Sequence, residues 1–297
     1  MFLLRPSVKA FLKEASRIPN YPLFERLHGY IYMRFPYLYI GIGTGEHPLA
    51  PLFRFIASLV TRLFPPSLGS PEFADTYHGK VIPLETARQL VSIREEIRVS
   101  YPEQVIPYKL ARDLILQNPD HIVVLDCPCR VSRQHPCLPL DVCLIIGEPF
   151  ASMVIEHHPK RSRWISQKEA LNILEAEESR GHVHHAFFKQ AVLGRFYAIC
   201  NCCSCCCGAI QAHRNGTPML ASSGYLSYVN EDLCMGCGTC NDYCQFEALS
   251  LENGYAKVDT ERCMGCGVCV SHCSQGALSL IIAPQKGEPL QIPTKAL

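Results

Sequence analysis

The sequence predicts an α+β protein in which a cysteine-rich α/β region precedes a small C-terminal domain built from two similar halves. Two observations predict this arrangement. The pattern C-x2-C-x2-C-x3-C occurs twice near the C-terminus, in residues 234–244 and 263–273. Upstream of it, helical apolar patterns alternate with short apolar runs typical of buried strands. We expect three regions, which are residues 1–75, 76–225 and 226–297.

Each copy of the repeated pattern has the spacing that holds a [4Fe–4S] cluster. Three thiolates of one run wrap around a cluster, and the fourth ligates the cluster of the other run. Four glycines beside the cysteines permit positive φ and close approach of backbone N–H groups to sulfur. The first predicted ligand set is Cys234, Cys237, Cys240 and Cys273, and the second is Cys263, Cys266, Cys269 and Cys244.

Zinc and disulfides are the alternatives for these eight cysteines. Zinc sites usually show paired C-x2-C knuckles that are separated by a dozen or more residues, whereas each run here is continuous. Disulfides are disfavoured by the tight spacing. The pattern therefore favours two iron–sulfur clusters.

Residues 228–283 resemble the bacterial 2[4Fe–4S] ferredoxin family. The similarity of the halves extends beyond the cysteines, because the segment Ala-Leu-Ser-Leu occurs at residues 248–251 and again at residues 277–280. The resemblance implies a ferredoxin-like dicluster domain in which each half has a turn, a cluster loop, a short helix and a strand. In that family a proline usually follows the fourth cysteine, whereas this chain has Gln245 and Ser274 there.

Composition and charge narrow the class of protein. The chain has 297 residues, 28 of them basic and 27 acidic, so no basic surface predicts nucleic-acid binding. Its 18 cysteines are grouped, and none precedes Cys127, which indicates metal sites instead of a disulfide scaffold. Reduced thiols and the lack of a secretory leader predict a cytoplasmic protein. No apolar stretch is long enough to span a bilayer.

The N-terminal region is rich in aromatic residues and proline. Apolar residues recur at helical spacing from Pro51, and Pro65-Pro66 is expected to end that helix. Two interpretations remain open. The helix packs on the protein's own core, or its apolar face docks on a membrane or on a larger redox partner.

The middle region carries further predicted elements. We expect helices in residues 84–99 and 110–116, and a buried strand in residues 121–126 that runs directly into Cys127. Ser166 and Glu169 form a capping box for a helix that Gly181 terminates. His182, His184 and His185 follow. We expect a polar loop, or one histidine that bonds the helix end, with metal ligands or a proton relay as the alternative.

Ten cysteines lie upstream of the repeat. The first set is Cys127, Cys129, Cys137 and Cys143, and the second is Cys200, Cys202, Cys203, Cys205, Cys206 and Cys207. Adjacent residues point in different directions, so the second set cannot face one cluster. We expect at least one additional iron–sulfur cluster here, with two cubanes, zinc, mononuclear iron and free thiols as alternatives. Arg130 is expected either to donate a hydrogen bond to a sulfide of a cluster or to balance its negative charge.

The order of these upstream elements resembles a group of ferredoxin-type proteins from anaerobic bacteria, a resemblance that implies no particular substrate. The patterns favour an electron-transfer protein or subunit that works with redox partner proteins, in a larger complex, at low potential. One alternative is a redox enzyme whose upstream cluster is fed by the dicluster domain. A redox sensor is the weakest of the three readings. The chain has no G-x-G-x-x-G and no Walker motif, so no nucleotide or flavin site is expected.

Overall fold

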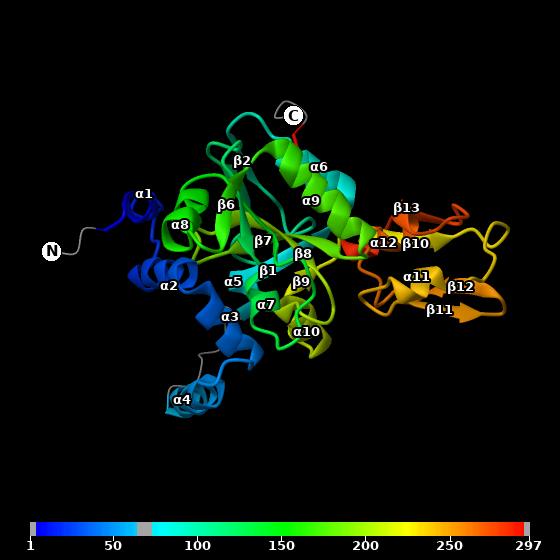
Figure 1. The fold of residues 1–297 in the computed structure, drawn as a ribbon, viewed down its shortest axis with the longest axis horizontal. Helices are drawn as coiled ribbons and strands as arrows, with labels where there is room; N and C mark the ends of the chain where they lie inside the picture. Colours follow the sequence, from blue (N-terminus) through cyan, green and yellow to red (C-terminus); the bar gives the residue numbers. More distant parts are fainter. Residues whose placement is uncertain (1–3, 64–72, 294–297) are drawn as a thin grey trace.

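A computed structural model describes residues 4–63 and 73–293, and its centre is a large mixed sheet with helices on both faces (Figure 1). The strands of this sheet are β1 Tyr77–Ile82, β2 Ile97–Ser100, β3 Asp113–Leu116, β4 Ile122–Asp126, β5 Asp141–Ile146, β6 Ser162–Ile165, β7 Val183–Lys189, β8 Arg195–Cys202 and β9 Leu220–Ala221. The main order is β6-β4-β5-β8-β7-β1-β9, while β3 pairs with β8 and with β2. Most pairs are antiparallel, and β1–β9 and β3–β8 are parallel.

The helices fall into two groups around this sheet. Those of the N-terminal part are α1 Pro6–Ala15, α2 Leu23–Arg34, α3 Pro36–Thr44, α4 Ala50–Leu63 and α5 Phe73–Thr76. Those that follow are α6 Leu84–Val91, α7 Pro128–Val131, α8 Phe150–His157, α9 Gln167–Ser179 and α10 Gly208–Arg214. Helices α6 and α9 lie together on one side of the sheet, and α1, α2 and α8 lie toward the N-terminal end of the molecule (Figure 1).

Both faces of the sheet are buried because its strands alternate apolar side chains between two cores. In β4, Val123 and Leu125 belong to the core that includes α1 and α8. Ile122 and Val124 of the same strand belong to the core that includes α6 and α9. This alternation follows from the period of two in a strand. The buried strand predicted at residues 121–126 is therefore confirmed, and it ends one residue before Cys127.

Of the two helices predicted in the middle region, the first is shorter than expected and the second is wrong. Helix α6 ends at Val91, and residues 97–100 form β2 instead of its continuation. The segment expected as a helix at residues 110–116 contains β3, which pairs with β2. Ile97 and Val99 are opposite Leu116 and Leu114, so apolar residues at a spacing of two are used by a strand pair.

The helix predicted after Ser166 is confirmed as α9. The Ser166 hydroxyl accepts a hydrogen bond from the Glu169 N–H at 3.2 Å, which caps the helix. Only this half of the predicted capping box forms, because the Glu169 carboxylate binds Arg163 instead. Gly181 follows the helix with φ of 80°, a conformation that glycine adopts without strain.

The N-terminal helices differ in what they contact. Val8, Phe11 and Met33 of α1 and α2 are buried in the core of the main sheet. In α4, by contrast, Ala50 is the only buried side chain among those that the structure describes. The interpretation that this helix packs on the protein's own core is therefore wrong. The predicted end at Pro65-Pro66 lies outside the described residues. None of the described helices has the length and apolar character required to cross a bilayer.

A smaller C-terminal segment extends from one end of the main sheet (Figure 1). It consists of β10 Tyr225–Val229, α11 Thr239–Asp242, β11 Leu249–Glu252, β12 Tyr255–Val258, α12 Val268–Ser271 and β13 Leu278–Ile282, followed by the 3-10 helix η1 Pro284–Lys286. Strand β10 pairs with β13, and β11 pairs with β12. Each half thus has the predicted cysteine loop, short helix and strand. The chain then returns to the main sheet, where Leu290 and Ile292 are buried.

Candidate iron–sulfur centres

The cysteines of the C-terminal segment surround two cavities of equal size, each with about 360 Å³ of free space that is partly open to solvent. Cavity I is lined by Cys234, Cys237, Cys240 and Cys273. Cavity II is lined by Cys244, Cys263, Cys266 and Cys269. The structure therefore brings together the two sets that the crossed spacing predicts, with one thiol of each set coming from the other run.

Backbone groups around the cavities suit bound sulfur. The N–H groups of Ala256 and Ala277 donate hydrogen bonds to the sulfurs of Cys234 and Cys273, at 3.4 and 3.3 Å. All four glycines beside the cysteines have positive φ, as predicted. At Gly265 a side chain would overlap the carbonyl oxygen of Tyr225, so only glycine allows the loop to lie this close to β10. Four thiols with backbone donors form the donor set that a [4Fe–4S] cluster requires.

The two cavities differ in exposure to solvent. Beside cavity I, Cys237 is exposed and Met235 is 73% exposed. Beside cavity II, Cys263 is buried and the corresponding Met264 is only 6% exposed. Burial raises the pKa of the Cys269 thiol to about 12. This thiol is protonated at neutral pH without a metal, so metal binding must release its proton.

The ten upstream cysteines gather at one end of β4, β5 and β8, which are neighbours in the sheet. Strand β4 ends just before Cys127, Cys143 lies on β5, and Cys200 and Cys202 lie at the end of β8. Because β4 and β8 are both antiparallel to β5, these three positions meet at the same end. Sequence spacing alone did not show which of the ten thiols lie together.

The upstream thiols form two groups. The outer thiol group has four sulfurs that all lie within 4.8 Å of one another, and it consists of Cys137, Cys203, Cys205 and Cys206. The inner thiol group is made of the other six upstream cysteines, which are Cys127, Cys129, Cys143, Cys200, Cys202 and Cys207. They line a pocket between the sheet and helices α2, α3 and α7, and Cys203 and Cys206 of the outer group also border this pocket. In the outer group, burial raises the pKa of the Cys203 thiol to about 12, so this thiol needs a metal to be deprotonated at neutral pH.

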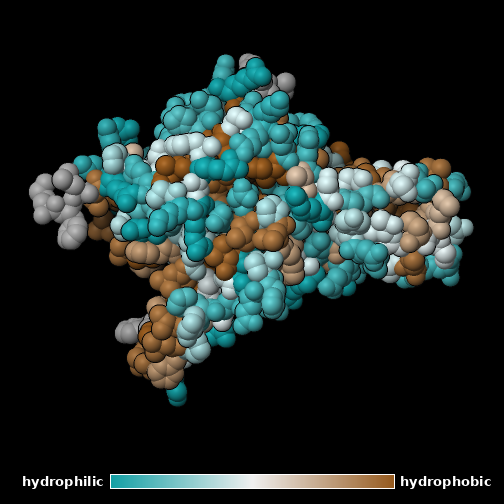
Figure 2. All heavy atoms as spheres, in the orientation of Figure 1, coloured by the Kyte–Doolittle hydropathy of each residue, from teal (hydrophilic) through white to brown (hydrophobic). Residues whose placement is uncertain are grey.

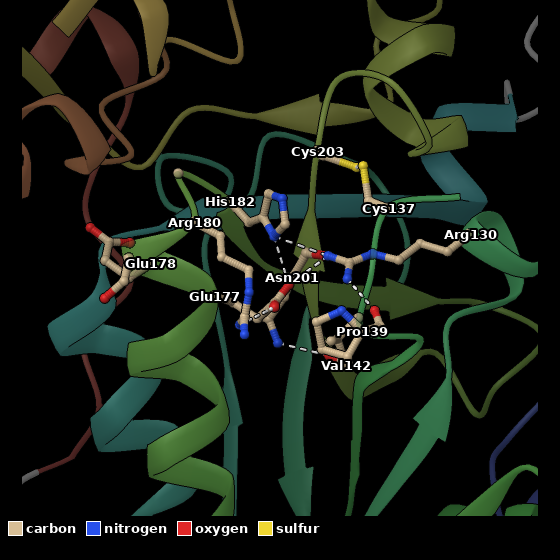
Figure 3. Close-up of polar contacts among 12 residues, drawn as sticks. Arg130, Cys137, Pro139, Val142, Glu177, Glu178, Arg180, His182, Asn201 and Cys203 are labelled. Carbon is tan, nitrogen blue, oxygen red and sulfur yellow. Dashed lines mark hydrogen bonds and ion pairs between the residues drawn. The ribbon is translucent and has the colours of Figure 1, made fainter. Parts of the chain in front are cut away.

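Arg130 has a different main partner from the one expected. Its buried guanidinium forms an ion pair with Glu177 of α9 and donates to the backbone oxygens of Pro139 and Asn201 (Figure 3). The charge of Arg130 is therefore balanced by a carboxylate of the protein. Its Nε nevertheless has no hydrogen-bond partner among the described residues, and Arg130 lines the inner pocket.

His184 and His185 lie on β7, a buried strand, instead of in a polar loop. His182 precedes β7, and its ring contacts the Glu177 carboxylate at 2.7 Å, so one histidine does bond the end of α9 (Figure 3). His184 contacts the side chain of Asn201 at 2.6 Å. His185 is fully buried, which lowers its pKa to about 3. None of the three belongs to the compact group of candidate metal ligands found among the described residues.

Gln245 joins the C-terminal segment to the upstream cysteines. Its Oε1 accepts a hydrogen bond from the Ser204 N–H at 2.7 Å, and its Nε2 donates to the Gly181 oxygen at 2.9 Å. Arg214 of α10 also donates a hydrogen bond to the backbone oxygen of Gln245. Ser204 lies within the upstream cysteine run, and Gln245 directly follows Cys244 of cavity II. The glutamine in place of the expected proline was the signal in the sequence for this contact.

The family model for the 4Fe-4S binding domain matches residues 227–250 and 256–279. Each match covers one cysteine run, so the two repeats support two [4Fe–4S] clusters. The upstream cysteines are consistent with a further cluster. No curated protein matches the chain. Residues 227–279 are thus a ferredoxin-type 4Fe–4S segment.

We expect the Arg130 ion pair to be important for stability. Replacement of Arg130→Met leaves Glu177 buried without its main charge partner and should cost about 3–5 kcal/mol. Arg163→Met is the control, because Arg163 is 49% exposed and pairs with Asp141 and Glu169 at the surface. Its loss should cost at most about 1 kcal/mol. Urea unfolding followed by circular dichroism measures both, and equal losses would contradict a special role of the buried pair.

Proposed function

We propose that the protein is an iron–sulfur electron-transfer protein or subunit. Single low-potential electrons pass through clusters in cavities I and II and then to a centre held by the upstream cysteines. The ligands of cavity I are Cys234, Cys237, Cys240 and Cys273, and those of cavity II are Cys244, Cys263, Cys266 and Cys269. Support for this assignment comes from the two equal cavities and from the match to the 4Fe-4S binding domain.

The contact of Gln245 with Ser204 is the main observation behind the proposal. It places a short path of covalent and hydrogen bonds between Cys244 of cavity II and the backbone of Ser204, which is flanked by Cys203 and Cys205. The equivalent residue of the other run is Ser274, and within the described part of the chain its side chain hydrogen-bonds only its neighbour Gln275. The two runs therefore differ at the position where one of them contacts the upstream cysteines.

The difference in exposure gives the path a direction. Cavity I lies beside the β11–β12 hairpin and includes the exposed Cys237, so a redox partner protein can approach it closely. Cavity II has no exposed cysteine, and Gln245, next to its Cys244, contacts the upstream cysteine run. An iron–sulfur cluster supplies one-electron chemistry, and the protein's thiols, amides and burial tune its potential. Free thiols in this number suit a reducing compartment, so we place the protein in the cytoplasm.

Replacement of Gln245→Ala tests the path. It removes both side-chain hydrogen bonds and leaves a through-space gap between Cys244 and Ser204, so electron passage to the upstream centre should slow. Reduction of the clusters in cavities I and II should stay at the wild-type rate. Rapid-freeze EPR of anaerobic protein during reduction by dithionite follows both steps.

The matched control is Ser274→Ala, at the equivalent position of the second run. This variant should pass electrons at the wild-type rate, because Ser274 makes no side-chain contact with the upstream cysteines. Unchanged passage in Gln245→Ala would contradict the proposed path. Absence of reducible cluster signals in the wild-type protein would contradict the function itself.

We also propose that α4 places the protein on an anionic membrane surface. Phe55 is 66% exposed and Leu63 is 64% exposed, and Leu52, Phe53, Ile56 and Leu59 are also exposed. Figure 2 shows this arm as a largely hydrophobic projection from the body. Residues 1–63 contain eight basic and three acidic residues, and α4 contains Arg54 and Arg62 but no acidic residue. An apolar face with basic flanks is typical of helices that lie in the interface of anionic bilayers.

Vesicle co-sedimentation tests this surface. Phe55→Glu should reduce binding to vesicles of phosphatidylcholine and phosphatidylglycerol by about tenfold or more, because an aromatic side chain can no longer be buried in the bilayer. Ile282→Glu is the control, since Ile282 is 67% exposed on β13, far along the chain from α4. Absence of wild-type binding to the anionic vesicles, or equal binding by the Phe55 variant, would contradict the membrane proposal and favour a protein partner.

A cleft beside the inner thiol group favours a redox enzyme as the second candidate function. The cleft lies between α3, α4 and α10, and Tyr77 and Cys129 line both the cleft and the inner pocket. A small molecule in this cleft would reach the edge of the upstream centre. Carbon monoxide added to the reduced protein is the probe. A change in the upstream EPR signal alone is expected for an enzyme with an open iron, and an unchanged spectrum is expected for a carrier.

A further inference from the structure

We infer that the upstream cysteines form two separate metal centres of different kinds. The outer thiol group holds a single divalent zinc or iron ion, and the inner thiol group holds a polynuclear iron–sulfur cluster. The inference deepens the proposed function and rests on it only for the redox role of the inner cluster. The division itself rests on the distances between the sulfurs.

The outer thiol group has the spacing of a site for one ion. The sulfur of Cys137 lies 3.0 Å from that of Cys205 and 3.6 Å from that of Cys203, and the sulfurs of Cys205 and Cys206 are 3.7 Å apart. Four thiolates at about 2.3 Å from one tetrahedral ion are about 3.8 Å from one another. A cubane carries an iron at each of four corners, so its thiolates must stand farther apart.

The C-terminal segment provides an internal comparison. Among the described residues, the outer thiol group is the one set of three or more candidate ligands whose atoms all lie within 4.8 Å of each other. The thiols around cavities I and II, which match a 4Fe-4S binding domain, do not meet this limit. The same chain thus spaces thiols widely where cubanes are supported and tightly in the outer thiol group.

The inner thiol group has too many ligands for one ion and a wider spacing. Its six sulfurs all line one pocket, from Cys127 just after β4 to Cys202 at the end of β8. No three of these sulfurs lie mutually within 4.8 Å. Six thiolates exceed the four of a tetrahedral ion, so they fit a cluster of several irons.

The pocket around the inner thiol group is suited to bind an anionic cluster. Its other walls include the side chains of Ile145 and Phe187, which exclude water. Arg130 also lines the pocket, is 1% exposed and keeps an Nε–H without a hydrogen-bond partner among the described residues. A buried donor of this kind is costly unless it meets an acceptor, and the sulfur of a cluster is such an acceptor.

Neighbouring cysteines are divided between the two groups. The compact outer group includes Cys203 and Cys206 but not their neighbours Cys202 and Cys207, although all four border the inner pocket. The outer ion would therefore fix the loop that carries Ser204, the residue that Gln245 contacts. We assign to the outer ion a positioning role, and to the inner cluster the redox role.

Metal analysis and Mössbauer spectroscopy of anaerobic, ⁵⁷Fe-enriched protein test the division. Two matched double variants remove neighbouring thiols, one combining Cys137→Ser with Cys205→Ser, the other combining Cys129→Ser with Cys207→Ser. The first should lose one metal ion per chain, either zinc or a mononuclear ferrous site, and should keep all cluster iron. The second should lose several irons and should keep the single ion.

Three results would overturn the inference. They are loss of several irons together from the first variant, loss of the same signal from both variants, and wild-type protein whose only iron is that of cavities I and II. If either variant does not fold, the Mössbauer spectrum and the zinc content of the wild-type protein decide. The inference requires one zinc or iron ion with four thiolate ligands, and cluster iron in excess of that of two cubanes. Absence of reducible signals from cavities I and II would instead contradict the proposed function and leave the metal count as it is.

Discussion

The antiparallel pairing of β4, β5 and β8 is the constraint on which the rest of the upstream site depends. Leu125 is opposite Cys143, and Leu144 is opposite Ile199, so the end of β4, the start of β5 and the end of β8 coincide. Thiols that are far apart in the sequence are thereby held together by backbone hydrogen bonds before any metal arrives. If the chain were flexible, metal binding would have to order it, and the lost conformational entropy would weaken that binding.

A buried polar network stabilises this end of the sheet. Arg130 follows β4, Glu177 lies in the last turns of α9, and Asn201 lies on β8, so their contacts join three elements (Figure 3). The Asn201 side chain also donates to the Val142 oxygen on β5. Charges buried this deeply are tolerated only when they are paired. The network therefore sets the position of the loop that carries Cys127 and Cys129.

The two halves of the C-terminal segment have the same local structure but different surroundings. Both halves keep the loop, the short helix and the strand, so both cavities have the same size. They differ in what surrounds them. One cavity faces solvent, while the other lies beside Gln245, which holds the segment to the upstream cysteines. Ser271 of α12 also donates to Glu178 of α9, which adds a second contact between the two parts.

Four features could be predicted from the sequence alone, because each depends on residue spacing within a short segment. They are the C-terminal ligand sets, the glycines beside them, the strand before Cys127 and the helix after Ser166. The helices expected at residues 84–99 and 110–116 failed in part, because β2 and β3 use the same apolar residues in pairing with each other. Only the tertiary structure decided which upstream thiols lie together, that Arg130 pairs with Glu177, and that α4 leaves its apolar face exposed. These properties depend on strand order and on contacts between distant segments, which no local pattern encodes.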